Sequence, residues 1–172
     1  IIFGVATMAF CLLFLDKLLF LFGASEATIG YAHEYMKILL WGNVVTHLYL
    51  GLNAILRSTG YPTKSMVVML ISVGVNCVLD PLFIFGFDWG IAGSAYATVI
   101  AQTTALIYEL VRFANPKNFL HFRRSIFRLR KDITLKIISI GMAPFLVQSC
   151  ASLVSMLNNN ALKEYGGDLH IG

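Results

Sequence analysis

The sequence predicts an all-α fold, that of a polytopic helical membrane protein. Of its 172 residues 58% are hydrophobic and only 13% are charged, and the mean hydropathy is +0.75. Such a chain has too few polar groups to cover a soluble domain of this length. Apolar runs recur at about the 20 residues that a helix needs to cross a bilayer. The alternating strands of about ten residues that would predict a membrane barrel do not occur.

Five apolar runs have the length of a membrane-spanning helix. They cover residues 1–22, 33–56, 66–86, 91–113 and 134–157. The first run has no initiating Met and no basic segment before it, which is not the pattern of a signal peptide. The last run continues into a polar segment with no basic tail. We therefore expect an internal fragment of a longer membrane protein.

The charges between the runs predict the orientation in the membrane. The segments 23–32 and 86–90 each carry a single acidic residue, whereas 57–65 and 112–136 are basic. Cytoplasmic loops attract Lys and Arg, so we expect the two basic segments inside and the two acidic segments outside. The net charge of +4 then reflects topology. The basic residues lack interleaved aromatic side chains, which argues against nucleic-acid binding, and 122–133 is instead expected to form an amphipathic helix on anionic lipid.

No pattern of an enzyme occurs in the chain. Cys11, Cys77 and Cys150 stand alone in separate runs and are expected to be reduced packing residues. His47 follows Asn43 by four residues, which predicts an interhelical hydrogen bond or, as the alternative, contact with an ion or substrate. Phosphate-binding loops, nucleophile elbows and zinc motifs are absent from the sequence.

Asp80 lies inside the third run and is followed at once by Pro81. A charged group far from water costs several kcal/mol unless it is paired, protonated or bound to a cation. One interpretation ends the helix before Asp80, which would then cap a new helix. The stretch 66–79 is too short to cross a bilayer, so we expect the helix to continue through a proline kink. Asp80 would then lie in the outer half of the membrane.

Polar residues recur every four positions on the third and fourth runs. They are Ser72, Asn76 and Asp80 on the third run, and Ser94, Thr98 and Gln102 on the fourth. Residues four apart share a helix face, and the short turn between the runs puts Asp80 and Thr98 at nearly the same depth. The two stripes can therefore face each other. Gly93 and Ala97 are small enough to let the backbones approach.

This cluster has two interpretations. Polar side chains can simply hold membrane helices together. A carboxylate inside a membrane more often marks a proton relay, an ion site or a substrate pathway. Carboxylate, amide and hydroxyl oxygens suit Na⁺, and the same carboxylate out of water suits a titrating proton.

The stretches "GLNAILRSTGYPTKSM" and "VNCVLDPLFIFGFDWGIAGSAYATVIAQ" resemble the fourth to sixth membrane segments of the multidrug and toxic compound extrusion (MATE) family, nearest its bacterial DinF-like branch. The resemblance extends back through "LFGASEATIGYAHEYMKIL" and forward through "ISIGMAPFLVQSCASLVSMLNNNALKEYGG". It implies segments three to seven of a two-lobe, twelve-helix transporter. Residues 1–113 would then belong to the N-terminal lobe, 114–133 to a basic cytoplasmic linker and 134–172 to the start of the C-terminal lobe.

The resemblance also implies a function, that of a secondary antiporter of the bacterial inner membrane. Entry of Na⁺ or H⁺ would drive export of small cationic, amphipathic compounds, with no other cofactor and with membrane lipid and the remaining helices as partners. The family's cation site matches Asn76, Asp80 and Thr98, which could hold Na⁺. Spacing adds Asn53 to this network and Tyr35 at its outer end. The main carboxylate of the family's site comes from a first segment that is not in this sequence.

Two further residues and two rival functions complete the expectations. Gln148 and Asn158 are predicted to line the substrate cavity. The consecutive residues Asn158, Asn159 and Asn160 cannot share one helix face. At least one of them should therefore serve packing or a helix end. The first rival is a flippase for lipid-linked oligosaccharides in the same superfamily. The second is a membrane scaffold without transport, in which Asp80 only locks helices together.

Overall fold

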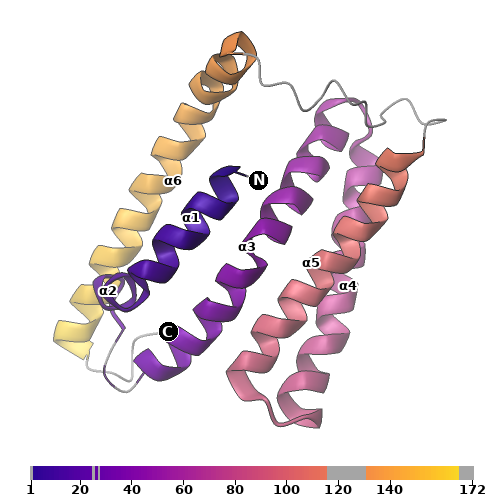
Figure 1. Cartoon of the computed structure of the whole chain (residues 1–172). Helices are drawn as coiled ribbons and strands as arrows, with labels where there is room; N and C mark the ends of the chain where they lie inside the picture. The colour runs from indigo at the N-terminus through magenta and orange to yellow at the C-terminus, as the bar shows by residue number, and fades with distance from the viewer. Residues whose placement is uncertain (1, 25, 27, 116–130, 167–172) are drawn as a thin grey trace.

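The computed structural model describes residues 2–24, 26, 28–115 and 131–166, and these ranges contain helices and turns but no strand. Figure 1 shows the helices, which in chain order are α1 (Ile2–Leu13), α2 (Leu15–Leu21), α3 (Ile29–Ser58), α4 (Pro62–Pro81), the π-helical turn η1 (Leu82–Gly86), α5 (Gly90–Ala114) and α6 (Lys131–Gly166). The prediction of an all-α fold is confirmed.

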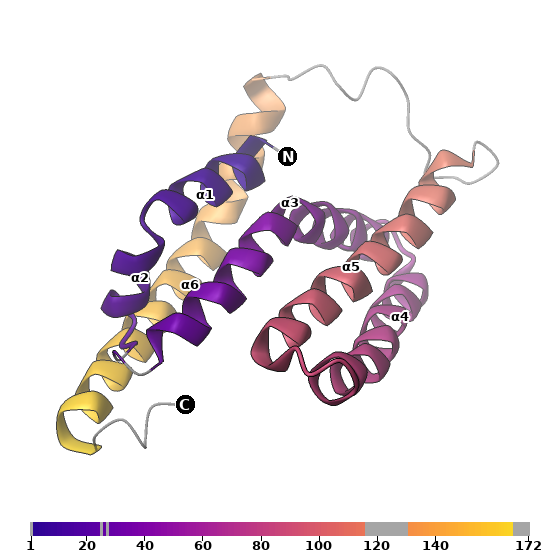
Figure 2. The ribbon, with the colours of Figure 1, turned by 60° about the horizontal axis from the view of Figure 1, so that its bottom comes forward.

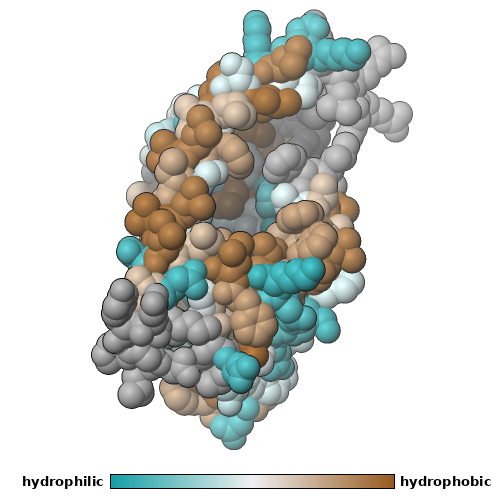
Figure 3. All heavy atoms as spheres, turned by 90° about the vertical axis from the view of Figure 1, so that its left-hand side faces the viewer, coloured by the Kyte–Doolittle hydropathy of each residue, from teal (hydrophilic) through white to brown (hydrophobic). Residues whose placement is uncertain are grey.

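Within the described residues, four helices are long and apolar enough to cross a membrane. They are α3, α4 with η1, α5 and α6, and the bent pair of α1 and α2 makes a fifth if it counts as one span. Few of their apolar side chains are buried within the chain, least of all on α6. Figure 3 shows apolar side chains over much of the molecular face on the side of α6. The chain is a multi-pass membrane protein.

The first run departs from the expected single span over residues 1–22. It is broken at Phe14 into α1 and α2, which are bent by 80° relative to each other. α2 carries the exposed charges of Asp16 and Lys17, and an Asp16 oxygen lies 3.6 Å from Nε2 of His33 on α3. A straight helix would carry these charges along the apolar axis of α1, where their desolvation is costly. The bend turns them away from that axis.

Two predicted links are shorter than expected because α3 extends beyond 33–56 at both ends. Of the segment 23–32, the last four residues already belong to α3, and only residues 59–61 join α3 to α4. Gly60 has a φ of +89°, which a glycine adopts readily just after a helix end. Pro62 starts α4 at a position where its missing N–H removes no helical hydrogen bond.

α3, α4 and α5 pack together as a bundle, with α1, α2 and α6 on the other side of α3 (Figures 1 and 2). Its apolar core consists of Tyr49, Leu52, Leu56, Val68, Ala105, Leu106 and Phe113. Small residues set the distances between the helices. A Cβ on Gly42 would lie 2.6 Å from Val99 of α5, and one on Gly93 would lie 3.0 Å from the backbone of Phe83. The expectation that Gly93 permits a close backbone approach is confirmed.

The helix containing Asp80 continues past Pro81, as expected from its length. Pro81 has no N–H to donate to the carbonyl of Cys77, and the chain widens into η1 directly after it. The turn to α5 contains Asp88 and Gly90 with φ of 54° and 55°. This turn makes α4 and α5 antiparallel neighbours, so that residues equally far from it lie at similar depths.

α6 is joined to α2 by the asparagines near its end. The Asn159 amide donates to the Phe22 carbonyl (3.2 Å), and the Asn160 amide donates to the Leu21 carbonyl (3.1 Å). These carbonyls belong to the end of α2, where helical partners are missing. The expectation that part of the asparagine run serves a helix end is confirmed. The predicted surface helix at 122–133 falls mostly outside the described residues.

Candidate functional site in the α3–α5 bundle

The polar stripes of α4 and α5 meet at Asn76 and Thr98. Nδ2 of Asn76 donates to Oγ1 of Thr98 at 3.4 Å, a long hydrogen bond, and the Thr98 hydroxyl donates to the Ser94 carbonyl at 3.0 Å. Both side chains are half-buried. Because Nδ2 makes the contact, the amide oxygen of Asn76 is available to accept a donor or a cation.

Asp80 lies one helical turn beyond Asn76 on the same face of α4. Its Oδ1 atom is buried and accepts no hydrogen bond within the described part of the chain. The Asp80 side chain as a whole is half-buried, and its buried oxygen is free to accept a donor or a cation. Asp80, Asn76 and Thr98 together offer carboxylate, amide and hydroxyl oxygens, which is a donor set that suits Na⁺.

The stripe on α5 divides between two neighbours. Thr98 contacts α4, whereas Gln102 accepts through Oε1 a hydrogen bond from the hydroxyl of Thr46 on α3. Ser94 enters the cluster through its backbone carbonyl. A helix turns by about 100° per residue, so positions four apart drift by about 40°, which suffices to direct Gln102 to a different helix.

Asn53 and Tyr35 lie away from the contact between Asn76 and Thr98. Asn53 pairs twice with Ser65 of α4, donating to its carbonyl (3.1 Å) and accepting from its hydroxyl (2.7 Å). Ser65 precedes Asn76 by eleven residues, or roughly 16 Å along the helix axis. Tyr35 lines a separate cavity of about 330 Å³ next to Ile91. These two residues thus depart from the network expected from spacing.

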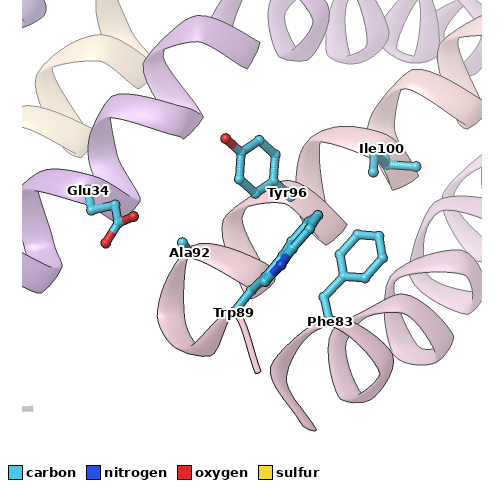
Figure 4. Close-up of a pocket in the computed structure, with 6 residues that line it drawn as sticks. All are labelled: Glu34, Phe83, Trp89, Ala92, Tyr96 and Ile100. Atoms are coloured by element: carbon cyan, nitrogen blue, oxygen red, sulfur yellow. The ribbon is translucent and has the colours of Figure 1, made fainter. Parts of the chain in front are cut away.

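A larger cavity opens beside Phe83, close to Asp80 in the chain. Its volume is about 640 Å³, and its lining consists of Glu34, Phe83, Trp89, Ala92, Tyr96 and Ile100. Figure 4 shows Trp89 beside both Phe83 and Tyr96, with Glu34 facing them from α3. The ring centroid of Trp89 lies 5.3 Å from that of Phe83 and 5.6 Å from that of Tyr96. Aromatic faces with one carboxylate attract organic cations.

The second-lobe candidates and the histidine lie elsewhere. Gln148 is exposed and lines a cavity of about 530 Å³ between α2 and α6, and Asn158 is exposed on α6. His47 bonds within its own helix, through Nδ1 to the Asn43 carbonyl at 2.9 Å. Its neighbour Asn43 makes the hydrogen bonds from α3 to α1: the Asn43 amide donates to the Gly4 carbonyl (2.9 Å) and to the Thr7 hydroxyl (3.2 Å).

One acidic residue was not singled out from the sequence. Glu109 of α5 is fully buried, and neither of its carboxylate oxygens accepts a hydrogen bond from the described residues. It lies inside the predicted span 91–113, so the cost argument used for Asp80 would have drawn attention to it. The described residues contain no group of three His, Cys, Asp or Glu side chains that could hold a metal ion.

Comparison with known proteins now connects this geometry to a family. Residues 1–82 match the MatE family model. The chain aligns over 96% of its length with the multidrug export protein MepA of Staphylococcus saprophyticus, at 29% identity. The MATE multidrug transporter DinF-BH, solved in complex with a ligand, superposes on 99% of the chain with a TM-score of 0.90 and 33% identity. Over nearly its whole length the chain is similar in sequence and fold to MATE transporters.

A second solved structure shows the same similarity. An inward-facing MATE transporter of the MOP superfamily superposes on 96% of the chain with a TM-score of 0.87 and 27% identity. The chain spans 37% of MepA and 38% of DinF-BH and of the inward-facing transporter. The MATE fold is thus represented here by a little more than a third of the length of these relatives.

Proposed function

We propose that this chain is part of a secondary multidrug antiporter, in which binding of Na⁺ or H⁺ at Asp80 drives export of cationic, amphipathic compounds. The observation that carries the proposal is the buried Oδ1 of Asp80, which has no hydrogen bond within the described residues, one turn from the contact between Asn76 and Thr98. A ligand shifts a conformational equilibrium only through different affinities for the two conformations. Asp80 lies next to Pro81 and η1, where a change of helix geometry requires the fewest lost hydrogen bonds.

The substrate class is supported by the cavity lined by Glu34 and the aromatic residues. Its volume of about 640 Å³ is within the range of roughly 300–1,000 Å³ that is usual for sites of drug-sized ligands. An organic cation can place its charge near Glu34 and its apolar part on Trp89 and Phe83. The structure of DinF-BH holds a drug-like ligand, which agrees with a substrate of this size.

We further propose where the chain sits in the complete transporter. It corresponds to segments three to seven of twelve in the DinF-like branch, with 1–113 in the N-terminal lobe, 114–133 as linker and 134–172 in the C-terminal lobe. The basic links 57–65 and 112–136 face the cytoplasm of a bacterial cell, and 23–32 and 86–90 face outward. The 33% identity to DinF-BH supports the branch.

The test uses the complete protein that carries this sequence, in energised inverted vesicles. Uptake of a fluorescent cationic dye is measured under separate H⁺ and Na⁺ gradients for wild type, Asp80→Asn and the control Asp88→Asn. Asp88 lies in the exposed turn and has a positive φ that Asn tolerates. We expect Asp80→Asn alone to lose coupled uptake, and the effective gradient identifies the ion. Equal uptake by all three proteins would contradict the proposal and favour a structural Asp80, whereas no uptake by wild type would favour the flippase.

A further inference from the structure

A second polar cluster lies at the opposite end of the α3–α5 bundle from Asp80. It is centred on Glu109, which is fully buried among the apolar core residues. Glu109 follows Thr98 by eleven residues on α5, or roughly 16 Å along the axis. Ser65 precedes Asn76 by the same number of residues on α4. Because α4 and α5 are antiparallel, Ser65 and Glu109 lie at a similar depth in the bundle.

Two polar side chains of α3, Tyr49 and Asn53, lie beside Glu109, and side chains of α4 contact them in turn. Tyr49 has Glu109 and Ser72 as polar neighbours, and Asn53 lies beside the Glu109 carboxyl group. The Asn53 amide is engaged with Ser65 through both its nitrogen and its oxygen. As a result, neither Glu109 oxygen accepts a hydrogen bond of good geometry from the described residues.

Three basic residues belong to the same end of the bundle as Glu109. Arg112 of α5 donates from Nη1 to the Tyr108 hydroxyl at 3.0 Å, and Lys64 of α4 lies over the Tyr61 ring at 4.1 Å. Arg57 of α3 is exposed. Among the described residues, no ion pair includes Glu109. Tyr49 is the remaining titratable group that faces it, and it carries no charge in its ordinary state.

We propose that Glu109 is a proton-binding site at the inner end of the bundle. Burial of an ionised carboxylate without a cation is far more costly than burial of a neutral carboxyl group, because only the charge requires solvation on that scale. A protonated Glu109 also gains a donor, which can reach Asn53 or Tyr49. A metal cation fits less well, because the Asn53 oxygen already accepts from Ser65 and the neighbouring described side chains supply no second carboxylate.

This site is distinct from Asp80, and proton binding here does not depend on transport. The two carboxyl groups lie at opposite ends of the same three helices, with Asn76, Ser72 and Tyr49 at intermediate positions along α4 and α3. A proton held at Glu109 would therefore make packing of the inner end of the bundle dependent on pH.

Infrared spectroscopy of the complete protein in phosphatidylcholine vesicles tests this site directly. A protonated carboxyl group has a C=O stretching band that a carboxylate lacks and that shifts on exchange into D₂O. We expect wild type to show such a band across a pH series, Glu109→Gln to lose it, and Asp16→Asn, which removes an exposed carboxylate, to keep it. An unchanged spectrum in Glu109→Gln would overturn the proposal.

Two further experiments address the cases in which Glu109→Gln does not fold or a metal ion occupies the site. If Glu109→Gln does not fold, Glu109→Asp and Asn53→Ala are used, and both are expected to shift the band because each changes the surroundings of the carboxyl group. A band that stays in place in both variants would overturn the assignment. Replacing choline by Na⁺ in the buffer should leave the wild-type band unchanged, and its loss would show a cation site instead. Failure of dye uptake would leave all these results standing.

Discussion

Asn76 of α4 donates its amide hydrogen to the hydroxyl of Thr98 on α5, at 3.4 Å. This contact joins two helices that are connected by η1 and a turn of three residues, 87–89. Asp80 lies one turn away on α4, and its Oδ1 has no hydrogen bond from the described residues. Under the proposed function, a cation or proton at Asp80 would alter the fit between α4 and α5 through this pair.

Replacing Thr98 by Val should weaken ion coupling by about tenfold, or ~1.4 kcal/mol, since it removes an oxygen and keeps the volume. The rate of dye uptake into vesicles is measured as a function of the size of the ion gradient. Thr104→Val is the matched control, because Thr104 makes the same type of bond, to the Ile100 carbonyl at 2.9 Å, but is exposed. Thr98→Ser should retain coupling. Equal coupling in the two valine variants would contradict a role for the Thr98 hydroxyl.

Gly93→Ala should lower the thermal stability of the protein in detergent. The added Cβ would lie 3.0 Å from backbone atoms of Phe83, which cannot move aside as a flexible side chain can. Overpacking costs about 1–3 kcal/mol, against a gain of up to about 1 kcal/mol in helix propensity. Gly74→Ala is the control, because nothing lies within 4 Å of the Cβ position there. A higher melting temperature for Gly93→Ala than for Gly74→Ala would contradict this packing.

The pair of Asn53 and Ser65 should show energetic coupling in a double-mutant cycle. Two hydrogen bonds join them, one in each direction. Interhelical hydrogen bonds in membranes average about 0.6 kcal/mol, so we expect a coupling of roughly 0.5–1.7 kcal/mol from Asn53→Ala, Ser65→Ala and the double variant. The free energy of unfolding in mixed micelles is the quantity measured. Additive effects would mean that the two bonds contribute nothing to the stability of the α3–α4 contact.

Trp89→Leu should weaken binding of a lipophilic cation such as tetraphenylphosphonium by about 3- to 30-fold. A cation on an aromatic face gains roughly 0.5–2 kcal/mol, and Trp89 is the ring that touches both other aromatic residues of the cavity. Isothermal titration calorimetry gives the affinity. Trp41→Leu serves as the control, because Trp41 is exposed on α3 and does not line this cavity. If both variants bind as wild type does, the cation binds elsewhere.

Much of the fold could be predicted from the sequence because hydrophobic length determines where membrane helices lie. Four of the five predicted spans fall within single continuous helices, and the continuation past Asp80 followed from length alone. The break at Phe14 could not be predicted in this way. Phe14 is neither Gly nor Pro, and the contact of Asp16 with His33 of α3 just after the bend depends on packing that the local sequence does not show.

The candidate site could be predicted where two residues are close to a short turn, and less well elsewhere. Depth counted from the turn put Asp80 level with Thr98, and the two polar stripes do meet, but the hydrogen bond to Thr98 comes from Asn76, one turn further along α4. The count could not reveal that Gln102 turns to Thr46, since this depends on the rotation of α3. Asn53 was assigned by spacing across a longer link, and its partner Ser65 emerged only from the packing of α3 on α4.

The hydrogen bonds from Asn159 and Asn160 to α2 also bear on how the chain assembles during synthesis. They join residues separated by 137 and 139 positions, whereas α4 and α5 form a hairpin with a very short turn. Neighbouring elements meet early, and distant ones must wait until the intervening chain has been made. The exposed carbonyls at the end of α2 thus remain without these partners until α6 has entered the membrane. The bundle of α3, α4 and α5 is complete by then, so it can serve as the template on which the later helices are ordered.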